Sequence, residues 1–178
     1  QNFKGHLSFV KVGKEGDMSI AFQIQCPGVN FDLSHAGKGK SHGWMFFSCY
    51  NTEQANTLLE VNASQKDKDF IMAVNWKKAE EYIKAGKGKM TSAKYAHNVY
   101  NESTHSATSE MKTQVLVLDS KELKDICYMI PCPKSPHGCD VDPTGEYIVG
   151  SGKLAALIPV FSFDKLQNAI KNKQFEGE

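Results

Sequence analysis

Short apolar runs separated by turn residues follow one another along most of this sequence. In the run 18–25, Met18, Ile20, Phe22 and Ile24 alternate with polar or small residues, which is the period expected of a β-strand with one buried face. The run 44–50 is apolar without alternation, so it predicts a strand that is buried on both faces. Further strands are predicted at 7–12, 70–76, 114–118, 127–130, 146–149 and 154–163.

Two segments have a helical pattern instead. In 77–85, Ala79, Tyr82 and Ile83 fall on one stripe, and Gly86 follows as a stop signal. The segment 164–171 predicts a second short helix. The chain is thus expected to be mostly strand, with helices as minor elements.

Two polar stretches predict loops. Residues 29–43 are rich in glycine and lysine, and residues 87–110 are polar without periodicity. The second stretch is predicted to be a long surface loop, and loops of that length are usually functional or disordered.

An internal repeat organises these elements. Residues 70–84 and 157–171 both read as an apolar strand, an aromatic residue and an amphipathic helix, and a glycine followed by an aromatic residue opens a strand before each. A recurring strand-rich unit with turn signals is typical of β-propeller blades, and about 40–50 residues per blade leave room for two to three of them. The predicted fold is all-β: part of a β-propeller, with short helices and a long inserted loop. Because both ends look like cuts, we expect residues 1–178 to be one piece of a propeller domain.

The composition argues against several classes of function. The formal net charge is +1 and all 21 basic residues are lysine, which argues against a nucleic-acid binder, since such proteins usually carry a strongly basic surface with arginine. No apolar run approaches the roughly 20 residues of a membrane span. The 5 cysteines form no Cys-x-x-Cys pair, so they predict small buried residues rather than a zinc site.

One histidine stands in a constrained context. In Pro136-His137-Gly138, proline fixes its own φ and glycine permits close backbone approach. The pattern predicts a tight turn that presents the imidazole of His137, which suits a metal ligand, a catalytic base or an ordinary turn residue. The remaining histidines are predicted to be solvated: His6, His35, His42, His97 and His105.

An oxygen-rich group stands at two strand ends. Tyr50 and Glu53 end one predicted strand, and Asp67 and Asp69 precede the next. Carboxylates and backbone carbonyls are ligands for hard cations, so a calcium site is one interpretation. A solvated acidic turn is the other, because no Asp-x-Asp-x-Asp loop is present.

Longer motifs resemble a known family. The stretches 44–53, 68–70 and 131–154, the last containing Pro-Lys-Ser-Pro-His-Gly, resemble nitrous oxide reductase, in particular the branch that lacks the usual twin-arginine leader. The resemblance implies a periplasmic homodimer that reduces N2O to N2 and water with electrons from a cytochrome or cupredoxin. It also implies a seven-bladed propeller holding a four-copper sulfide cluster (CuZ), and a C-terminal cupredoxin domain with a CuA centre that is not present in this chain.

The same resemblance assigns site residues. It makes His137 one histidine ligand of the copper cluster, and it implies a calcium site near the cluster. The calcium ligands it implies are Tyr50, Glu53, Asp69, the backbone carbonyl near Val61, and Ser135, with Asp67 as a competitor to Asp69. Many family members carry asparagine at the position of Ser135, so ligation through its side chain or its carbonyl stays open.

A second interpretation needs no catalysis. A β-propeller that binds a partner through its loops, stabilised by calcium, would also account for the repeat and for a chain with no complete site. On either interpretation the 178 residues alone are predicted to be inactive, because one histidine cannot assemble a multi-copper cluster.

Overall fold

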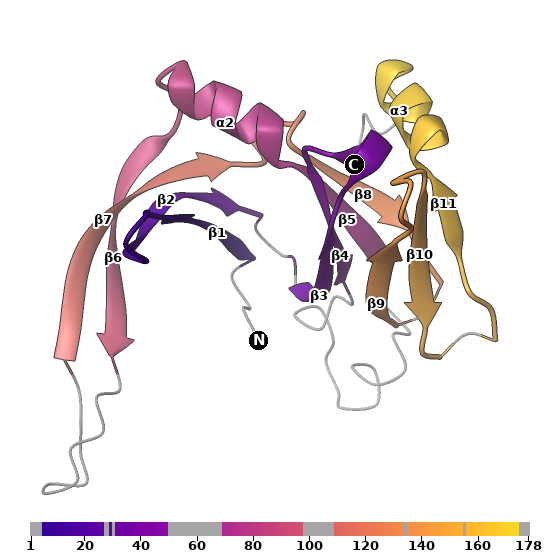
Figure 1. The fold of residues 1–178 in the computed structure, drawn as a ribbon, viewed down its shortest axis with the longest axis horizontal. Helices are drawn as coiled ribbons and strands as arrows, with labels where there is room; N and C mark the ends of the chain where they lie inside the picture. Colours follow the sequence, from indigo (N-terminus) through magenta and orange to yellow (C-terminus); the bar gives the residue numbers. More distant parts are fainter. Residues whose placement is uncertain are drawn as a thin grey trace, which may run out of the picture.

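The computed structural model describes residues 5–26, 29, 31–49, 69–97, 109–133, 135–154 and 156–174. Its elements are shown in Figure 1. In chain order they are β1 (His6–Val12), β2 (Met18–Gln25), β3 (Phe31–Ala36), the 3-10 turn η1 (Gly39–Ser41), β4 (Trp44–Cys49), β5 (Phe70–Asn75), α2 (Trp76–Lys84), β6 (Lys89–His97), β7 (Ser109–Asp119), β8 (Cys127–Pro131), β9 (Pro136–Val141), β10 (Tyr147–Gly152), β11 (Val160–Ser162) and α3 (Phe163–Lys171).

The strands form three sheets. Sheet A has the order β1-β2-β7-β6, sheet B the order β3-β4-β5-β8, and sheet C the order β11-β10-β9. Sheets B and C are antiparallel throughout. The strand that comes first in the chain, β3 in sheet B and β9 in sheet C, is called the inner strand of that sheet. The predicted class is confirmed: the chain is an all-β, propeller-like set of sheets with short helices. Among the described residues, no helix has the length and apolar character needed to cross a membrane.

Sheet B lies between two hydrophobic cores. One core packs sheet A residues such as Ile24 and Leu118 against Phe47 of β4. The other packs Phe46 of β4 against Ile148 of sheet C and against α3. Successive side chains of a strand point to opposite faces, and in β4 both faces meet a core. The prediction that this strand is buried on both faces is therefore confirmed.

The internal repeat predicted from sequence is present. The unit β3-β4-β5-α2 matches the unit β9-β10-β11-α3 in order and pairing. Asn75 and Ser162 occupy the same position in the two units, and each caps its helix by accepting a hydrogen bond from a backbone N–H. Each cap residue also pairs across the sheet with the first residue of the preceding strand, Trp44 or Tyr147.

Three sequence predictions were wrong. The glycine- and lysine-rich stretch contains β3, and the stretch predicted as a long loop contains β6 and part of β7, which pair along their whole length. Through β7, this hairpin adds to β2 in parallel and completes sheet A. Polar strands show no apolar alternation, so pairing rather than periodicity defines them. Finally, the predicted strand 154–163 is reduced to β11, after Pro159, which has no N–H for a sheet ladder.

Candidate functional site

His137 lies in a strand and not on a tight turn. It is the second residue of β9. The turn is made one step earlier by Ser135, whose φ of 55° places it in the left-handed region. Pro136 then opens the strand opposite Gly152. Sequence reasoning placed the corner too late because proline and glycine flank the histidine, although both fit an extended strand here.

The side chain of His137 is accessible and faces a carboxylate. The imidazole is 56% exposed, and its Nε2 lies 3.8 Å from Oδ2 of Asp32 on β3. That oxygen is buried and has no hydrogen-bond partner among the described residues. His137 also lines an open cavity of about 360 Å³ together with Leu33, Asp140, Ser151 and other residues of β9 and β10. The site therefore combines an open side with a buried acceptor behind the imidazole.

A second histidine–aspartate pair joins the same two strands. His35 Nδ1 on β3 lies 2.9 Å from Oδ1 of Asp140 on β9. His35 and Asp140 are each the penultimate residue of their strand, and Asp32 and His137 stand three residues before them. Equivalent positions of the two units thus hold histidine in one strand and aspartate in the other. His35 was predicted to be a solvated loop residue, but it belongs to β3 and is paired.

Sequence reasoning missed Asp32, His35 and Asp140 as a group. The signal was present: Asp-x-x-His at 32–35 and His-x-x-Asp at 137–140 have the same spacing in reverse order. The matching spacing of the two motifs gains meaning only when β3 is known to be a strand equivalent to β9.

Two of the residues predicted to bind calcium lie together. Asp69 is 8% exposed and Ser135 is 5% exposed. Oδ2 of Asp69 accepts a hydrogen bond of 2.7 Å from the backbone N–H of Ser135, and the carbonyl of Ser135 accepts one from the N–H of Lys153. Asp69 therefore holds the turn from which β9 and His137 begin. The other predicted calcium residues, Tyr50, Glu53, Val61 and Asp67, lie outside the described residues.

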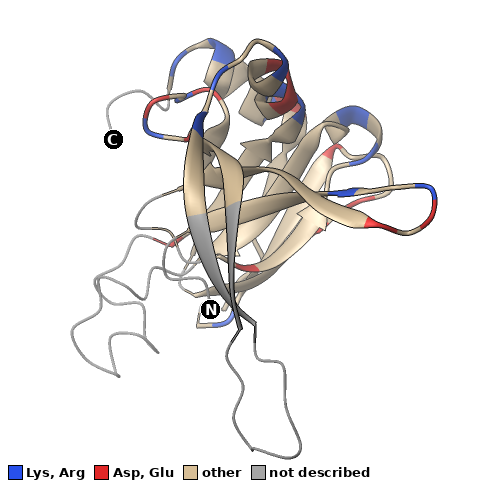
Figure 2. Cartoon of the chain, turned by 90° about the vertical axis from the view of Figure 1, so that its left-hand side faces the viewer, with Lys and Arg blue, Asp and Glu red and all other residues tan. Residues whose placement is uncertain are grey.

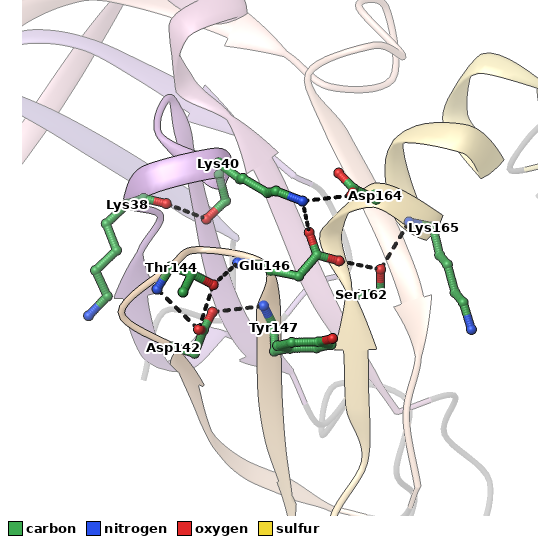
Figure 3. A network of polar contacts seen from close by, with 10 residues as sticks. Lys38, Lys40, Asp142, Thr144, Glu146, Tyr147, Ser162, Asp164 and Lys165 are labelled. Atoms are coloured by element: carbon green, nitrogen blue, oxygen red, sulfur yellow. Dashed lines mark hydrogen bonds and ion pairs between the residues drawn. The ribbon is translucent and has the colours of Figure 1, made fainter.

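A polar network fixes sheet C against sheet B at the other end of β9 (Figure 3). Lys40 of η1 reaches Glu146 at 2.9 Å and Asp164 at 2.8 Å. Glu146 also accepts a hydrogen bond of 2.6 Å from the hydroxyl of Ser162. The Ser162 hydroxyl and then Lys40 lower the pKa of Glu146. Because these groups come from both units, the network holds β3 and β9 in a fixed relation.

Acidic and basic residues both occur at the end of the described structure that carries the helices. In Figure 2, blue and red segments alternate around the two helices and the neighbouring turns. Within the described ranges, no group of three or more histidine, cysteine, aspartate or glutamate side chains is arranged to hold a metal ion. What these residues offer together is one accessible imidazole with a carboxylate behind it, and one buried carboxylate at the base of the same strand.

Comparison with known proteins agrees with the resemblance read from sequence. No protein-family model matches the chain. The chain is 26% identical to the nitrous-oxide reductase of Stutzerimonas stutzeri over 160 residues, which is 88% of this chain and 21% of that protein. It is also 26% identical to the nitrous-oxide reductase of Pseudomonas fluorescens over 158 residues, again 88% of this chain and 21% of the relative. The chain thus spans about a fifth of the length of the curated relatives it matches, and over most of its own length it is similar to nitrous-oxide reductases.

Proposed function

We propose that this chain is part of the propeller domain of a nitrous-oxide-reducing copper enzyme, in which His137 is one ligand of the copper cluster. The similarity over 88% of the chain supports the enzyme class. The observation that carries the role of His137 is its position: an accessible imidazole on β9 that faces a buried oxygen of Asp32, for which the described residues supply no hydrogen-bond partner.

This donor set fits a copper-bound histidine. A metal-ligating imidazole usually donates its second ring N–H to a carboxylate or carbonyl, which fixes the tautomer and the ring orientation. Asp32 Oδ2 is a buried acceptor on the side of Nε2, which leaves the other ring nitrogen of His137 for copper. The 3.8 Å separation is longer than a hydrogen bond, so a small rotation of the ring completes the contact.

When bound, a sulfide-bridged copper cluster would supply the two electrons that, with two protons, convert N2O to N2 and water. The residues described here have supporting roles in that reaction. His137 would be a neutral ligand, and Asp32 would fix the tautomer of its imidazole. The ion pairs of Lys40 link the unit that contains β3 to the unit that contains β9.

We further propose a calcium site that includes Asp69 and Ser135, with Tyr50, Glu53 and a carbonyl near Val61 as further ligands and Asp67 as the competitor of Asp69. The hydrogen bond between Asp69 and Ser135 supports it, because it brings two of these residues together at the base of β9. The carbonyl of Ser135 accepts a hydrogen bond from Lys153 but keeps a second lone pair, so its hydroxyl and its carbonyl are both candidate ligand atoms. Oxygen ligands of this kind are those that calcium prefers.

For the complete protein, the proposal includes properties that the family resemblance implies. These are a periplasmic location, a homodimer, a CuA centre in a cupredoxin domain outside this chain, and a cytochrome or cupredoxin as electron donor. The 178 residues alone are proposed to lack turnover of N2O.

The experiment is the variant His137→Ala in the complete protein, measured by copper content, visible absorption and N2O reduction. Loss of cluster copper and of activity supports the proposal. Unchanged copper and activity would contradict it. A complete protein that neither binds copper nor reduces N2O, yet loses stability on calcium chelation, would favour the non-catalytic calcium-stabilised scaffold.

A further inference from the structure

Two thiols meet where sheet A joins sheet B. Cys26 directly follows β2, and Cys127 is the first residue of β8. Their Sγ atoms lie 3.5 Å apart, although 101 positions separate them in the sequence. Cys26 is a member of the core between the two sheets, and Cys127 packs against that core.

The remaining cysteines have different surroundings. The thiol of Cys139 donates to the carbonyl of Phe46 at 3.2 Å, and that of Cys49 donates to the carbonyl of Phe47 at 3.7 Å. Cys132 is a half-buried residue whose sulfur lies beside Gly150. All 5 cysteines are described, so the pairing of sulfur with sulfur distinguishes Cys26 and Cys127 from the other three.

The two sulfurs are in contact but are not bonded. A disulfide has an S–S bond of about 2.05 Å, so the sulfurs must approach by about 1.5 Å from the observed 3.5 Å. Rotation of two side chains about χ1 is a short path for that approach, because the sulfurs already face each other.

The two thiols share a hydrogen bond in which either sulfur can be the donor. With Cys127 as the donor, this bond lowers the pKa of Cys26, and the same bond and burial raise the pKa of Cys127. The thiolate is the reactive form of cysteine, so a lowered pKa at one member of the pair favours thiol exchange there.

We propose that Cys26 and Cys127 form a disulfide that fastens sheet A to sheet B, with a small-molecule or protein disulfide as the oxidant. One of the two cysteines, as a thiolate, attacks one sulfur of the oxidant and forms a mixed disulfide, and one thiol leaves. The other cysteine loses its proton and attacks Sγ of the first, and the second thiol leaves. Two cysteine thiols are oxidised to one disulfide, and one oxidant disulfide is reduced to two thiols.

The proposed disulfide would link two residues that are far apart in the sequence. Sheet A combines β1 and β2 with β6 and β7 (Figure 1), and its side chains pack against those of sheet B. A covalent link at Cys26 restricts the unfolded chain over the 101 positions between the two residues. The inference does not depend on the proposed copper chemistry.

The test is disulfide mapping of the complete protein after incubation with oxidised glutathione. Free thiols are alkylated in denaturant, the protein is digested without reduction, and peptides are identified by mass spectrometry. The expected result is one linked species that contains Cys26 and Cys127 and disappears after dithiothreitol treatment. Recovery of both as separate alkylated peptides, or a link from either one to another cysteine, would overturn the proposal.

Stability provides the matched control. Dithiothreitol is expected to lower the Tm of the oxidised wild-type protein and of Cys132→Ser, and to leave the Tm of Cys127→Ser unchanged. An equal effect of reductant on all three proteins would contradict the inference. Because the mapping needs only the wild-type protein, it decides the matter even where Cys127→Ser fails to fold.

Discussion

The units β3-β4-β5-α2 and β9-β10-β11-α3 share a scaffold but differ in what surrounds them and in what they carry. Sheet B has a fourth strand, β8, and is covered on both faces. Sheet C has three described strands and exposes apolar residues along its outer part, among them Ile158 at 72% and Val160 at 58%. The same positions hold Asp32 and His35 in one inner strand but His137 and Asp140 in the other. The two units thus repeat the same backbone arrangement but carry different side chains at equivalent positions.

The largest difference in mutational effect between the two units is expected when equivalent isoleucines are replaced. Ile71 on β5 is 0% exposed, and its counterpart Ile158 is 72% exposed. Replacing a buried isoleucine with alanine leaves a cavity and costs about 2–5 kcal/mol, whereas an exposed site changes stability by about 0.5 kcal/mol or less. We therefore expect Ile71→Ala to lower the free energy of unfolding strongly and Ile158→Ala to have little effect, measured by urea denaturation of this chain.

Equal losses for the two variants would show that the units are equally covered in solution. In the complete protein, a large loss for Ile158→Ala that is absent from this chain would indicate that a neighbouring segment covers sheet C.

The next largest effect on stability is expected from replacing the buried carboxylate at the base of β9. Asp69→Ala removes the acceptor for the N–H of Ser135, and a hydrogen bond to a charged group contributes about 1.5–3 kcal/mol. The matched control is Asp140→Ala, since the side chain of Asp140 is 84% exposed in its pair with His35 and exposed pairs contribute about 1 kcal/mol or less. Thermal unfolding of both variants makes the comparison. A smaller effect at Asp69 than at Asp140 would refute the structural role of the Asp69–Ser135 contact.

The helix caps should behave alike in the two units. Asn75→Ala and Ser162→Ala each remove a side-chain acceptor for the first turn of a helix, at a cost of about 1 kcal/mol each. Ser162 also donates to Glu146, so its variant is expected to cost slightly more. Circular dichroism during denaturation checks this, and a loss confined to Asn75→Ala would break the equivalence of the two helices.

The smallest expected effect depends on pH and concerns one unit alone. In the β9–β10 turn, hydrogen bonds from Thr144 and Tyr147 lower the pKa of Asp142 from 3.8 to about 2. A carboxyl whose pKa is depressed by folding stabilises the fold above its unfolded pKa, and that stabilisation is lost as the pH falls through the folded value. We expect the wild-type protein to lose stability relative to Asp142→Asn between about pH 4 and pH 2.

Because an asparagine side chain does not titrate, the difference in stability between the wild-type protein and Asp142→Asn should be constant above this window. A difference that instead changes between about pH 5 and pH 8 would contradict the assignment, since neither the folded nor the unfolded pKa lies there. The equivalent turn of the first unit contains Lys38 and Lys40 and no acidic residue, so it contributes no matching acid transition.

The sequence predicted the parts of this fold that periodicity and repetition encode. The strand predicted at 18–25, the unbroken apolar run before Tyr50 and the strand-helix repeat all appear at nearly the predicted positions. In the first of these, Phe22 and Ile24 are buried, whereas Met18 and Ile20 are exposed. Among the missed strands are β3, β6 and the first part of β7. These lack an alternating apolar pattern, so their pairing with neighbouring strands defines them, and the local sequence does not report that pairing.

The candidate site was predictable only in part. The motif around His137 singled out this residue, and the family resemblance implied a role for it, but neither pointed to Asp32, which is far away in sequence. Its relevance comes from β3 lying beside β9, which is a property of the sheet arrangement. The contact between Asp69 and Ser135 could not be predicted from their spacing in sequence, and their role as calcium ligands stays a prediction.

The most direct test of the account compares the two histidines on the neighbouring inner strands. His137→Ala and His35→Ala are prepared in the complete protein, and copper per protein is measured by elemental analysis. We expect His137→Ala to lose cluster copper and His35→Ala, which removes only the partner of Asp140, to retain it. Full copper in His137→Ala, or equal loss in both variants, would contradict the assignment of His137 as the copper ligand of this chain.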